Sequence, residues 1–167
     1  MKTLYLCRHA KSSWADPGMD DFDRPLNERG LRNAPFMANV FKERGEPVDL
    51  IVTSPANRAR TTARSFVTAL DLHPDRFTEE RAIYLAERHA LAHLISKLPN
   101  SADRVVLFGH NPGFTDVLNH FSDAGVDNLP TCGMVRIDFA VNDWQHVVKG
   151  SGTLVWFDYP KRHEGQG

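Results

Sequence analysis

The segment Leu4-Tyr5-Leu6-Cys7-Arg8-His9-Ala10-Lys11 changes abruptly from apolar to polar: four apolar residues are followed directly by an arginine and a histidine. A short, continuous apolar run of this kind is typical of a strand that is buried on both faces of a parallel sheet. We therefore predict a buried strand over Lys2–Cys7. Ligands of open parallel sheets bind just beyond the carboxyl ends of the strands, so Arg8 and His9 are candidate site residues.

Similar apolar segments recur along the chain, with helical patterns between them. Further buried strands are predicted at Val48–Thr53, Arg104–Phe108 and Thr153–Asp158, and a partly alternating strand, suited to an edge or antiparallel position, at Met134–Val141. Helices are predicted at Asn27–Arg44, Pro55–Leu70, Ala86–Leu98 and Pro112–Phe121. Ser54 and Asn111 stand where helix-capping residues are expected, each followed by a proline at the first helical position.

This alternation of strands and helices predicts the fold class. We expect a three-layer α/β/α sandwich with a mostly parallel central sheet and an antiparallel edge strand. The chain of 167 residues fits one domain, which we place at residues 1–160. Residues 161–167 form a short polar C-terminal tail that we expect to fray.

Composition and charge narrow the classes of function. The formal net charge is −1 and the isoelectric point is near 6.7, so there is no global reason to expect nucleic acid as a partner. The N-terminus lacks the apolar stretch of a signal peptide, and no segment approaches the length of a membrane span. We expect a cytoplasmic protein in which any anion site is a local cluster of cationic side chains.

Cationic and polar side chains follow three of the predicted strands. Arg8 and His9 follow the first strand, Arg58 lies just after the second, and His110 follows the strand over Arg104–Phe108. Each turn taken alone is more often an ordinary polar loop or helix cap. Together, at one edge of a parallel sheet and beside helix N-termini, they predict a pocket for a tetrahedral phosphoryl group.

These turns also carry a family resemblance. The opening Arg8-His9-Ala10-Lys11-Ser12-Ser13-Trp14, the block Asp23-Arg24-Pro25-Leu26-Asn27-Glu28-Arg29-Gly30, the turn Thr53-Ser54-Pro55 through Arg58-Ala59, and Phe108-Gly109-His110-Asn111-Pro112 resemble the motifs of the histidine phosphatase superfamily. The opening and the short length look most like the SixA-type phosphohistidine phosphatases. The resemblance implies a phosphoglycerate mutase-like fold.

The resemblance also implies roles for individual residues. His9 would be the nucleophile, and Arg8, Arg58 and a protonated His110 would bind the phosphoryl oxygens. Ser12 and Asn111 would make further contacts with the substrate. Such a mechanism would form a phosphohistidine intermediate on His9 and would need no cofactor.

The sequence departs from the superfamily at the expected general acid. Glu87 is the nearest candidate by position, although a solvated position on a helix is the more ordinary interpretation of it. Ala15 stands near a position where many members have asparagine, and there is no long insertion to build a substrate cap. An open site of this kind suits a phosphorylated protein loop better than a sugar phosphate.

Three functions remain open at this point. The first is hydrolysis of phosphohistidine in a partner protein, the second is a phosphomonoesterase acting on a small metabolite or on phosphoserine and phosphothreonine, and the third is a non-catalytic phosphate-binding module. A metal site is not predicted. His89 and His93 have a metal-compatible spacing, but no glutamate follows His89 and no third ligand is evident.

Overall fold

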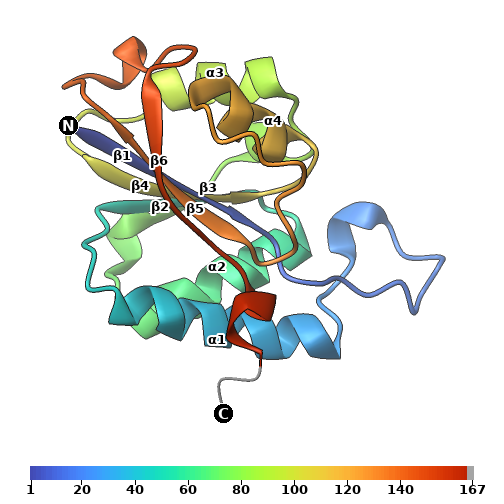
Figure 1. The fold of residues 1–167 in the computed structure, drawn as a ribbon. Helices are drawn as coiled ribbons and strands as arrows, with labels where there is room; N and C mark the ends of the chain where they lie inside the picture. Colours follow the sequence, from blue (N-terminus) through green and yellow to red (C-terminus); the bar gives the residue numbers. More distant parts are fainter. Residues whose placement is uncertain (165–167) are drawn as a thin grey trace.

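The computed structural model describes residues 1–164 and shows a central sheet between two layers of helices (Figure 1). The described residues form a six-stranded sheet in the order β3-β2-β4-β1-β5-β6. The strands are β1 (Lys2–Arg8), β2 (Leu50–Thr53), β3 (Phe77–Glu79), β4 (Arg104–Gly109), β5 (Met134–Phe139) and β6 (Gly152–Asp158). Strand β5 is antiparallel to both β1 and β6, and the other pairings are parallel. This architecture confirms the predicted fold class.

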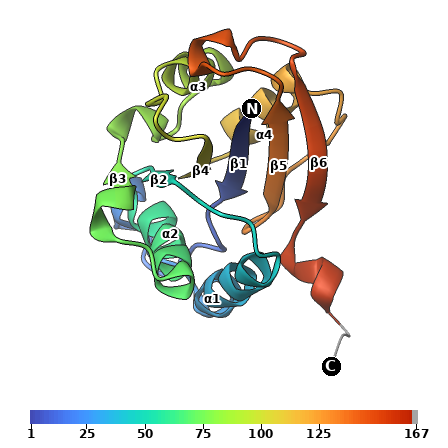
Figure 2. The same ribbon diagram turned by 90° about the vertical axis from the view of Figure 1, so that its left-hand side faces the viewer.

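The helices cover the sheet on both faces. Helices α1 (Glu28–Glu43) and α2 (Asn57–Leu70) pack on one face, and α3 (Arg88–Ser96) and α4 (Gly113–Phe121) pack on the other (Figures 1 and 2). Successive residues of each strand point to opposite faces, so the core divides in two. On β1, Leu4 and Leu6 join the core under α3 and α4, whereas Tyr5 and Cys7 join the core under α1 and α2.

The order of the last strands differs from the expectation. The antiparallel strand β5 is interior, and β6 lies at an edge of the sheet. Most residues of β6 are exposed or only half-buried, so the prediction of a fully buried strand over Thr153–Asp158 was wrong. Its apolar residues are partly buried on both faces. Trp156 lies against Tyr5 and Phe41, whereas Leu154 and Phe157 pack against the core under α3 and α4, and Val155 is exposed. The short strand β3 was not predicted, because three residues are too few to establish a period.

All four helices begin one or two residues later than predicted, and at two of them the predicted cap is affected. Helix α2 starts at Asn57 with Ala56 at its N-cap, so Ser54 is not the cap. The Ser54 hydroxyl lies 2.8 Å from a ring nitrogen of His110. Helix α4 starts at Gly113 rather than Pro112. Asn111 still caps the first turn of α4, since its Oδ1 accepts a hydrogen bond from the backbone N–H of Thr115.

The segment between β1 and α1 projects from the body of the molecule (Figure 1) and carries the short 3₁₀ helix Asp21–Asp23. It is anchored by a bridge between Ser12 and Leu26 and by a close crossing over the start of α1. A Cβ atom at Gly30 would lie 2.2 Å from the carbonyl oxygen of Lys11. A glycine is therefore required at this crossing.

The C-terminal segment begins as ordered structure, in contrast to the fraying expected for residues 161–167. Pro160–His163 form a 3₁₀ helix, and the His163 ring lies 2.8 Å from a carboxylate oxygen of Asp158 and packs against Phe36 of α1. These contacts tie the segment to the sheet and to α1. The rest of the expected tail, residues 165–167, lies outside the described residues.

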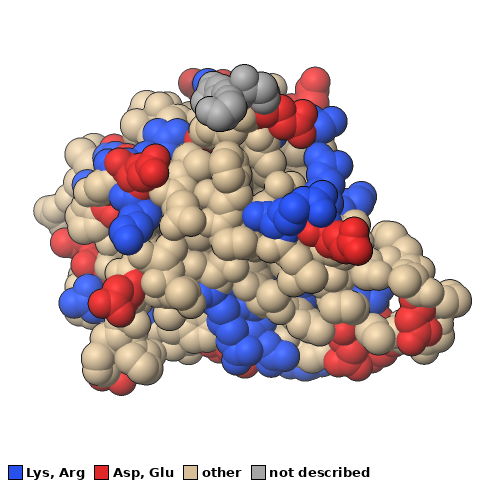
Figure 3. All heavy atoms as spheres, turned by 90° about the horizontal axis from the view of Figure 1, so that it is seen from below, with Lys and Arg blue, Asp and Glu red and all other residues tan. Residues whose placement is uncertain are grey.

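The outer face formed by α1 and α2 carries acidic and basic side chains in mixed positions (Figure 3), and neither sign covers it. Among residues 1–164, no helix combines the length and the apolar character that crossing a bilayer requires.

Candidate active site

The carboxyl ends of β1, β2 and β4 meet at one edge of the sheet. Arg8 pairs in register with Gly109, and Thr53 with Phe108, so the residues that follow these strands emerge side by side. They enclose a pocket of about 280 Å³. Its lining residues are Arg8, His9, Lys11, Ser12, Trp14, Asp21, Arg24, Arg58, Leu85, His110, Asn111 and Thr131. The sequence-predicted residues Arg8, His9, Ser12, Arg58, His110 and Asn111 are therefore brought together.

His9 lies on the floor of the pocket and is nearly fully buried. Its Nδ1 lies 2.7 Å from the carbonyl oxygen of Ala10, which can only accept a hydrogen bond, so Nδ1 carries the ring proton. The other ring nitrogen, Nε2, then has a free lone pair, and Nε of Arg58 donates toward it at 3.4 Å. Burial, aided by the charges of Arg58 and Arg8, lowers the pKa of His9 to about 3. The ring is neutral at physiological pH.

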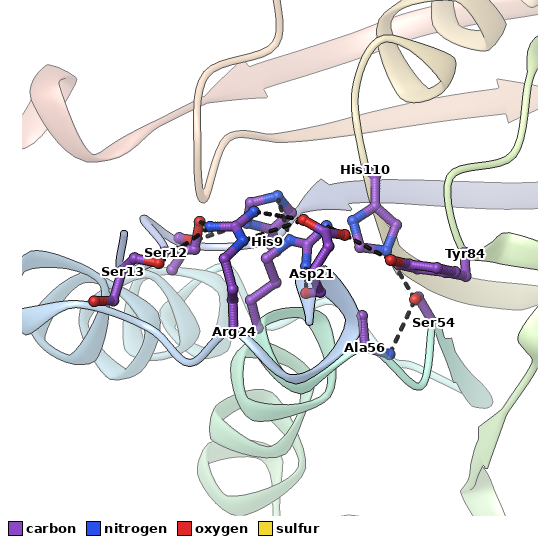
Figure 4. Close-up of polar contacts among 11 residues, drawn as sticks. His9, Ser12, Ser13, Asp21, Arg24, Ser54, Ala56, Tyr84 and His110 are labelled. Carbon is purple, nitrogen blue, oxygen red and sulfur yellow. Dashed lines mark hydrogen bonds and ion pairs between the residues drawn. The ribbon is translucent and has the colours of Figure 1, made fainter. Parts of the chain in front are cut away.

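Arg58 is held in place by Asp21, which sequence reasoning did not identify. Arg58 lies in the first turn of α2 and is buried. Its Nη1 donates to the carbonyl oxygen of Asp21 at 2.7 Å, and its Nη2 donates to the Asp21 carboxylate at 3.0 Å. Figure 4 shows this carboxylate, which comes from the projecting segment before α1, pointing toward Arg24 on one side and Tyr84 on the other.

The Asp21 carboxylate also accepts hydrogen bonds from two other residues. Arg24 donates to Oδ1 through both Nε and Nη2, and the Tyr84 hydroxyl donates to Oδ2 at 2.6 Å (Figure 4). Although burial raises the pKa of Asp21, the bonds from Tyr84 and Arg24 and the charge of Arg58 bring it down to about 2. Asp21 is thus a fixed anion that orients two guanidinium groups.

Two buried nitrogen atoms of the pocket residues lack a hydrogen-bond partner within the described part of the chain. Nη1 of Arg8 donates to the carbonyl oxygen of Leu129 at 2.9 Å, but Nε has no acceptor. Nε2 of His110 lies 2.8 Å from the Ser54 hydroxyl, and Nδ1 has no partner. Buried polar atoms in native proteins are nearly always paired, so these two atoms indicate that the pocket receives a polar ligand.

His110 was expected to be protonated, and its surroundings in the protein oppose that state. Burial, followed by the neighbouring His9 ring and the charge of Arg58, lowers the pKa of His110 to about 3. The rings of His9 and His110 have centroids 5.3 Å apart. A dianion bound between them would favour protonation, because an adjacent negative charge stabilises the imidazolium form.

Ser12 and Asn111 line the pocket, but their side-chain polar atoms bind other protein groups. The Ser12 hydroxyl accepts a hydrogen bond from Nη1 of Arg24 at 2.6 Å. The Asn111 amide donates to the carbonyl oxygen of Leu129 and to Asn128. The amide hydrogens of Asn111 are therefore used within the pocket wall, whereas the Ser12 hydroxyl keeps its own hydrogen for a ligand.

Glu87 is not brought to His9. Its side chain is 83% exposed, lies 3.7 Å from His89, and lines a separate hollow of about 680 Å³ between the start of α3 and the start of α4. Glu87 stands at the N-cap of α3, an exposed position at the start of a helix. Within residues 1–164, no group of three or more His, Cys, Asp or Glu side chains is arranged to hold a metal ion, and His89 with His93 forms no such group.

The residues missed from the sequence lie on the projecting segment. Arg24 belongs to one of the motif blocks that resemble the histidine phosphatases, yet the block was given no role. Asp21 stands in the acidic run Asp20-Asp21-Phe22-Asp23, which by itself reads as a solvated loop. Only the fold shows that this loop turns back over the first turn of α2.

Comparisons with known proteins agree with this geometry. The sequence model of the histidine phosphatase superfamily (branch 1) matches residues 4–104. An uncharacterized protein of Mycobacterium tuberculosis is 32% identical over 164 residues, covering 92% of this chain and 99% of its own length. An uncharacterized chloroplastic protein of Arabidopsis thaliana is 28% identical over 167 residues, covering 93% of this chain and 74% of its own length.

Solved structures show the same fold. A protein of Agrobacterium tumefaciens, assigned provisionally as the phosphohistidine phosphatase SixA, has a TM-score of 0.80 at 30% identity over 95% of this chain and 98% of its own. The protein histidine phosphatase SixA in complex with tungstate has a TM-score of 0.81 at 19% identity, with 97% and 99% covered. Together with the family match and the pocket around His9, these findings establish that the chain belongs to the histidine phosphatase superfamily and is a phosphatase.

Proposed function

We propose that this phosphatase hydrolyses phosphohistidine in a partner protein and that the reaction passes through a phosphorylated His9. His9 is the nucleophile in this proposal, and Arg8, Arg58 and His110 bind the phosphoryl oxygens. The proposal rests on the pocket geometry, and above all on the state of the one carboxyl group that lines the pocket.

The anion site is supported by the unpartnered nitrogens. Nε of Arg8 and Nδ1 of His110 are buried without partners in the described structure, and both can donate to a phosphoryl oxygen. Arg58 adds a buried positive charge next to Nε2 of His9. Charge-assisted bonds of this kind are each worth about 1.5–3 kcal/mol, and they stabilise the charge on the equatorial oxygens during transfer.

The reaction then follows in two displacements. The lone pair on Nε2 of His9 forms a bond to phosphorus, while the bond between phosphorus and the substrate imidazole breaks and its electron pair stays with the imidazole. Nδ1 of His9 keeps its proton and donates it in a hydrogen bond to the carbonyl oxygen of Ala10. The oxygen of a water molecule next forms a bond to phosphorus while the bond between phosphorus and Nε2 of His9 breaks. Its electron pair returns to the ring, which is again neutral, and the protons of the water leave with inorganic phosphate or pass to solvent.

The leaving group decides the substrate class. Within residues 1–164, Asp21 is the only carboxylic acid that lines the pocket, and it is ionised and bound to Arg24, Arg58 and Tyr84. A carboxylate with a pKa of about 2 is a poor proton donor at neutral pH. Expulsion of an alkoxide needs such a donor, whereas a phosphorylated imidazole takes a proton from solvent and leaves as a neutral ring. The pocket therefore favours phosphohistidine over alkyl phosphates.

The comparison with the provisionally assigned SixA of Agrobacterium tumefaciens supports the same substrate. The mouth of the pocket is also formed by exposed side chains, which leaves room for a phosphorylated residue that belongs to a larger protein.

A substrate panel with trapping of the intermediate tests the proposal. Phosphate release is measured from a phosphohistidine-bearing protein, p-nitrophenyl phosphate and phosphoserine, and acid-labile phosphate on His9 is sought by mass spectrometry. We expect rapid release from phosphohistidine, slower release from the aryl ester, and the least from phosphoserine. His9→Ala abolishes turnover, while the matched control His89→Ala, a change outside the pocket, retains it.

Arg58→Ala separates binding from chemistry. Phosphate binding and turnover both fall, because this change removes a charge next to the phosphoryl group, whereas His9→Ala keeps phosphate binding in part. Efficient cleavage of phosphoserine, or phosphate trapped on a residue other than His9, would overturn the proposal and favour a small-molecule phosphomonoesterase.

A further inference from the structure

The mouth of the pocket contains two exposed apolar side chains. Most of the lining residues are buried or half-buried, and the exposed ones are Lys11, Trp14 and Leu85. Trp14 is 71% exposed and Leu85 is 55% exposed. Large apolar side chains that are exposed beside a polar pocket commonly mark a contact surface for a ligand.

Trp14 is held in place before any ligand arrives. The guanidinium carbon of Arg24 lies 3.6 Å from the centre of the Trp14 ring system. Arg24 is itself buried and fixed by bonds to the Asp21 carboxylate and the Ser12 hydroxyl. One face of the indole is thus stacked on a fixed cation, while most of the side chain is open. A fixed aromatic surface loses little conformational entropy when it contacts a ligand.

Leu85 is held in the mouth by an unusual backbone conformation. Its φ of 52° lies in the left-handed region, which leucine adopts rarely and at a cost of about 1 kcal/mol or more. The turn is fixed by the hydrogen bond from Ala86 N–H to the carbonyl oxygen of Ile83 and by the neighbouring Tyr84, whose hydroxyl binds Asp21. A strained residue that exposes an apolar side chain at a pocket mouth points to a binding role.

In-line transfer places the leaving group at this mouth. The nucleophile Nε2 of His9 lies on the buried floor, and the leaving atom departs from the side of phosphorus opposite to the attacking atom. The group attached to that atom therefore extends toward the exposed lining residues.

We propose that Trp14 and Leu85 form a leaving-group subsite that contacts the flat imidazole ring of the substrate phosphohistidine. This inference rests on the proposed function and names the residues that select the ring. The ring offers an apolar face of a size that an indole and a leucyl side chain can cover. Stacking and apolar contacts of this type are worth about 0.5–1.5 kcal/mol.

Two substrates with the same kind of phosphorus–nitrogen bond test the subsite. N-phosphoimidazole carries the ring, and phosphoramidate carries ammonia in its place. The readout is the ratio of kcat/KM for N-phosphoimidazole to kcat/KM for phosphoramidate. Trp14→Ala is expected to lower this ratio by roughly three- to tenfold, and Trp14→Phe by much less, because phenylalanine retains a stacking face.

The second variant removes the Leu85 side chain and keeps its backbone. Asparagine tolerates the left-handed conformation, so Leu85→Asn is expected to fold and to lower the ratio in the same direction. Val155→Ala, which removes an exposed apolar side chain from the edge strand β6, is the matched control and leaves the ratio unchanged.

The outcomes separate the two proposals. If the wild-type protein cleaves neither substrate, the proposed function fails. If it cleaves both, and Trp14→Ala and Leu85→Asn lower both values of kcat/KM equally, the phosphatase mechanism stands and the leaving-group subsite is wrong.

Discussion

Nε of Arg58 lies 3.4 Å from Nε2 of His9, although the two residues are 49 positions apart in the sequence. This contact places a permanent positive charge beside the lone pair of the ring. Together with burial it makes protonation of His9 unfavourable, so the nucleophile is in its reactive form without help from a general base.

The first prediction concerns the protonation of this ring. We expect His9 to remain neutral, with its proton on Nδ1, as the pH is lowered from 7 to 4, because burial lowers its pKa to about 3. Nitrogen-15 NMR of the imidazole rings measures both the tautomer and the protonation. The urea-unfolded protein, in which histidine titrates near 6.5, provides the reference. A His9 signal that titrates near 6.5 in the folded protein would contradict the assignment.

A second prediction links the same burial to stability. For His9 and His110 the folded-state pKa of about 3 lies below the unfolded value, so between about pH 6.5 and 3 the unfolded chain binds more protons. The free energy of unfolding therefore falls as the pH decreases through this range. Between pH 7 and 5 each ring accounts for up to about 2 kcal/mol. Urea titrations at both pH values measure this loss, and His110→Gln should show less of it than the wild type.

The third prediction concerns Asp21 as a positioning residue. Asp21→Asn removes the anion that orients the guanidinium groups of Arg24 and Arg58. We expect kcat to fall by about tenfold, as for loss of a charge-assisted bond, while the inhibition constant for inorganic phosphate does not weaken, because a negative charge has left the pocket. Steady-state kinetics with phosphate as a competitive inhibitor distinguish the two effects. Equal losses in kcat and in phosphate affinity would indicate a general collapse of the pocket.

A fourth prediction concerns Glu87. Its side chain is exposed and lies outside the pocket, so Glu87→Gln should change phosphohistidine turnover by less than about twofold. The test is the rate of phosphate release from phosphohistidine and from phosphoserine at pH 7. A strong, selective loss of phosphoserine cleavage in the variant would show that Glu87 reaches the leaving group and supplies a proton.

A fifth prediction concerns metals. In the proposed mechanism the positive charge comes from Arg8, Arg58 and the start of α2, so activity is expected to survive dialysis against a strong chelator. Phosphate release before and after dialysis measures this. Recovery of a lost rate on addition of a divalent cation would require a different mechanism.

The fold was largely predictable because its signals are local. The apolar run before Arg8 and the helical periodicities each report one element, and alternation of the elements implies a parallel sheet. The edge position of β6 was not predictable, since its apolar residues pack in part against both cores, as those of an interior strand do.

The pocket residues also fall into a group that the sequence predicted and a group that it did not. The sequence placed His9, Arg8, Arg58 and His110 at the strand ends, because each stands at a fixed offset from an apolar run. Asp21 and Leu85 lie on loops whose course depends on contacts between distant segments, such as the bond from Tyr84 to Asp21. A loop of this kind has no periodic hydrophobic pattern from which its course could be predicted.

The reversed direction of β5 has a consequence for how such a site can vary. Because β5 begins at the edge where its neighbours end, the chain that leads into it, residues 122–133, arrives beside the pocket. That incoming segment supplies the Leu129 carbonyl that fixes Arg8, and it adds Thr131 to the pocket wall. Its length is not constrained by the register of any strand. Insertions there can raise or lower one wall of the pocket without moving Arg8, Arg58 or His110. Related proteins can therefore differ in how openly the phosphoryl group is reached while they keep the same sheet.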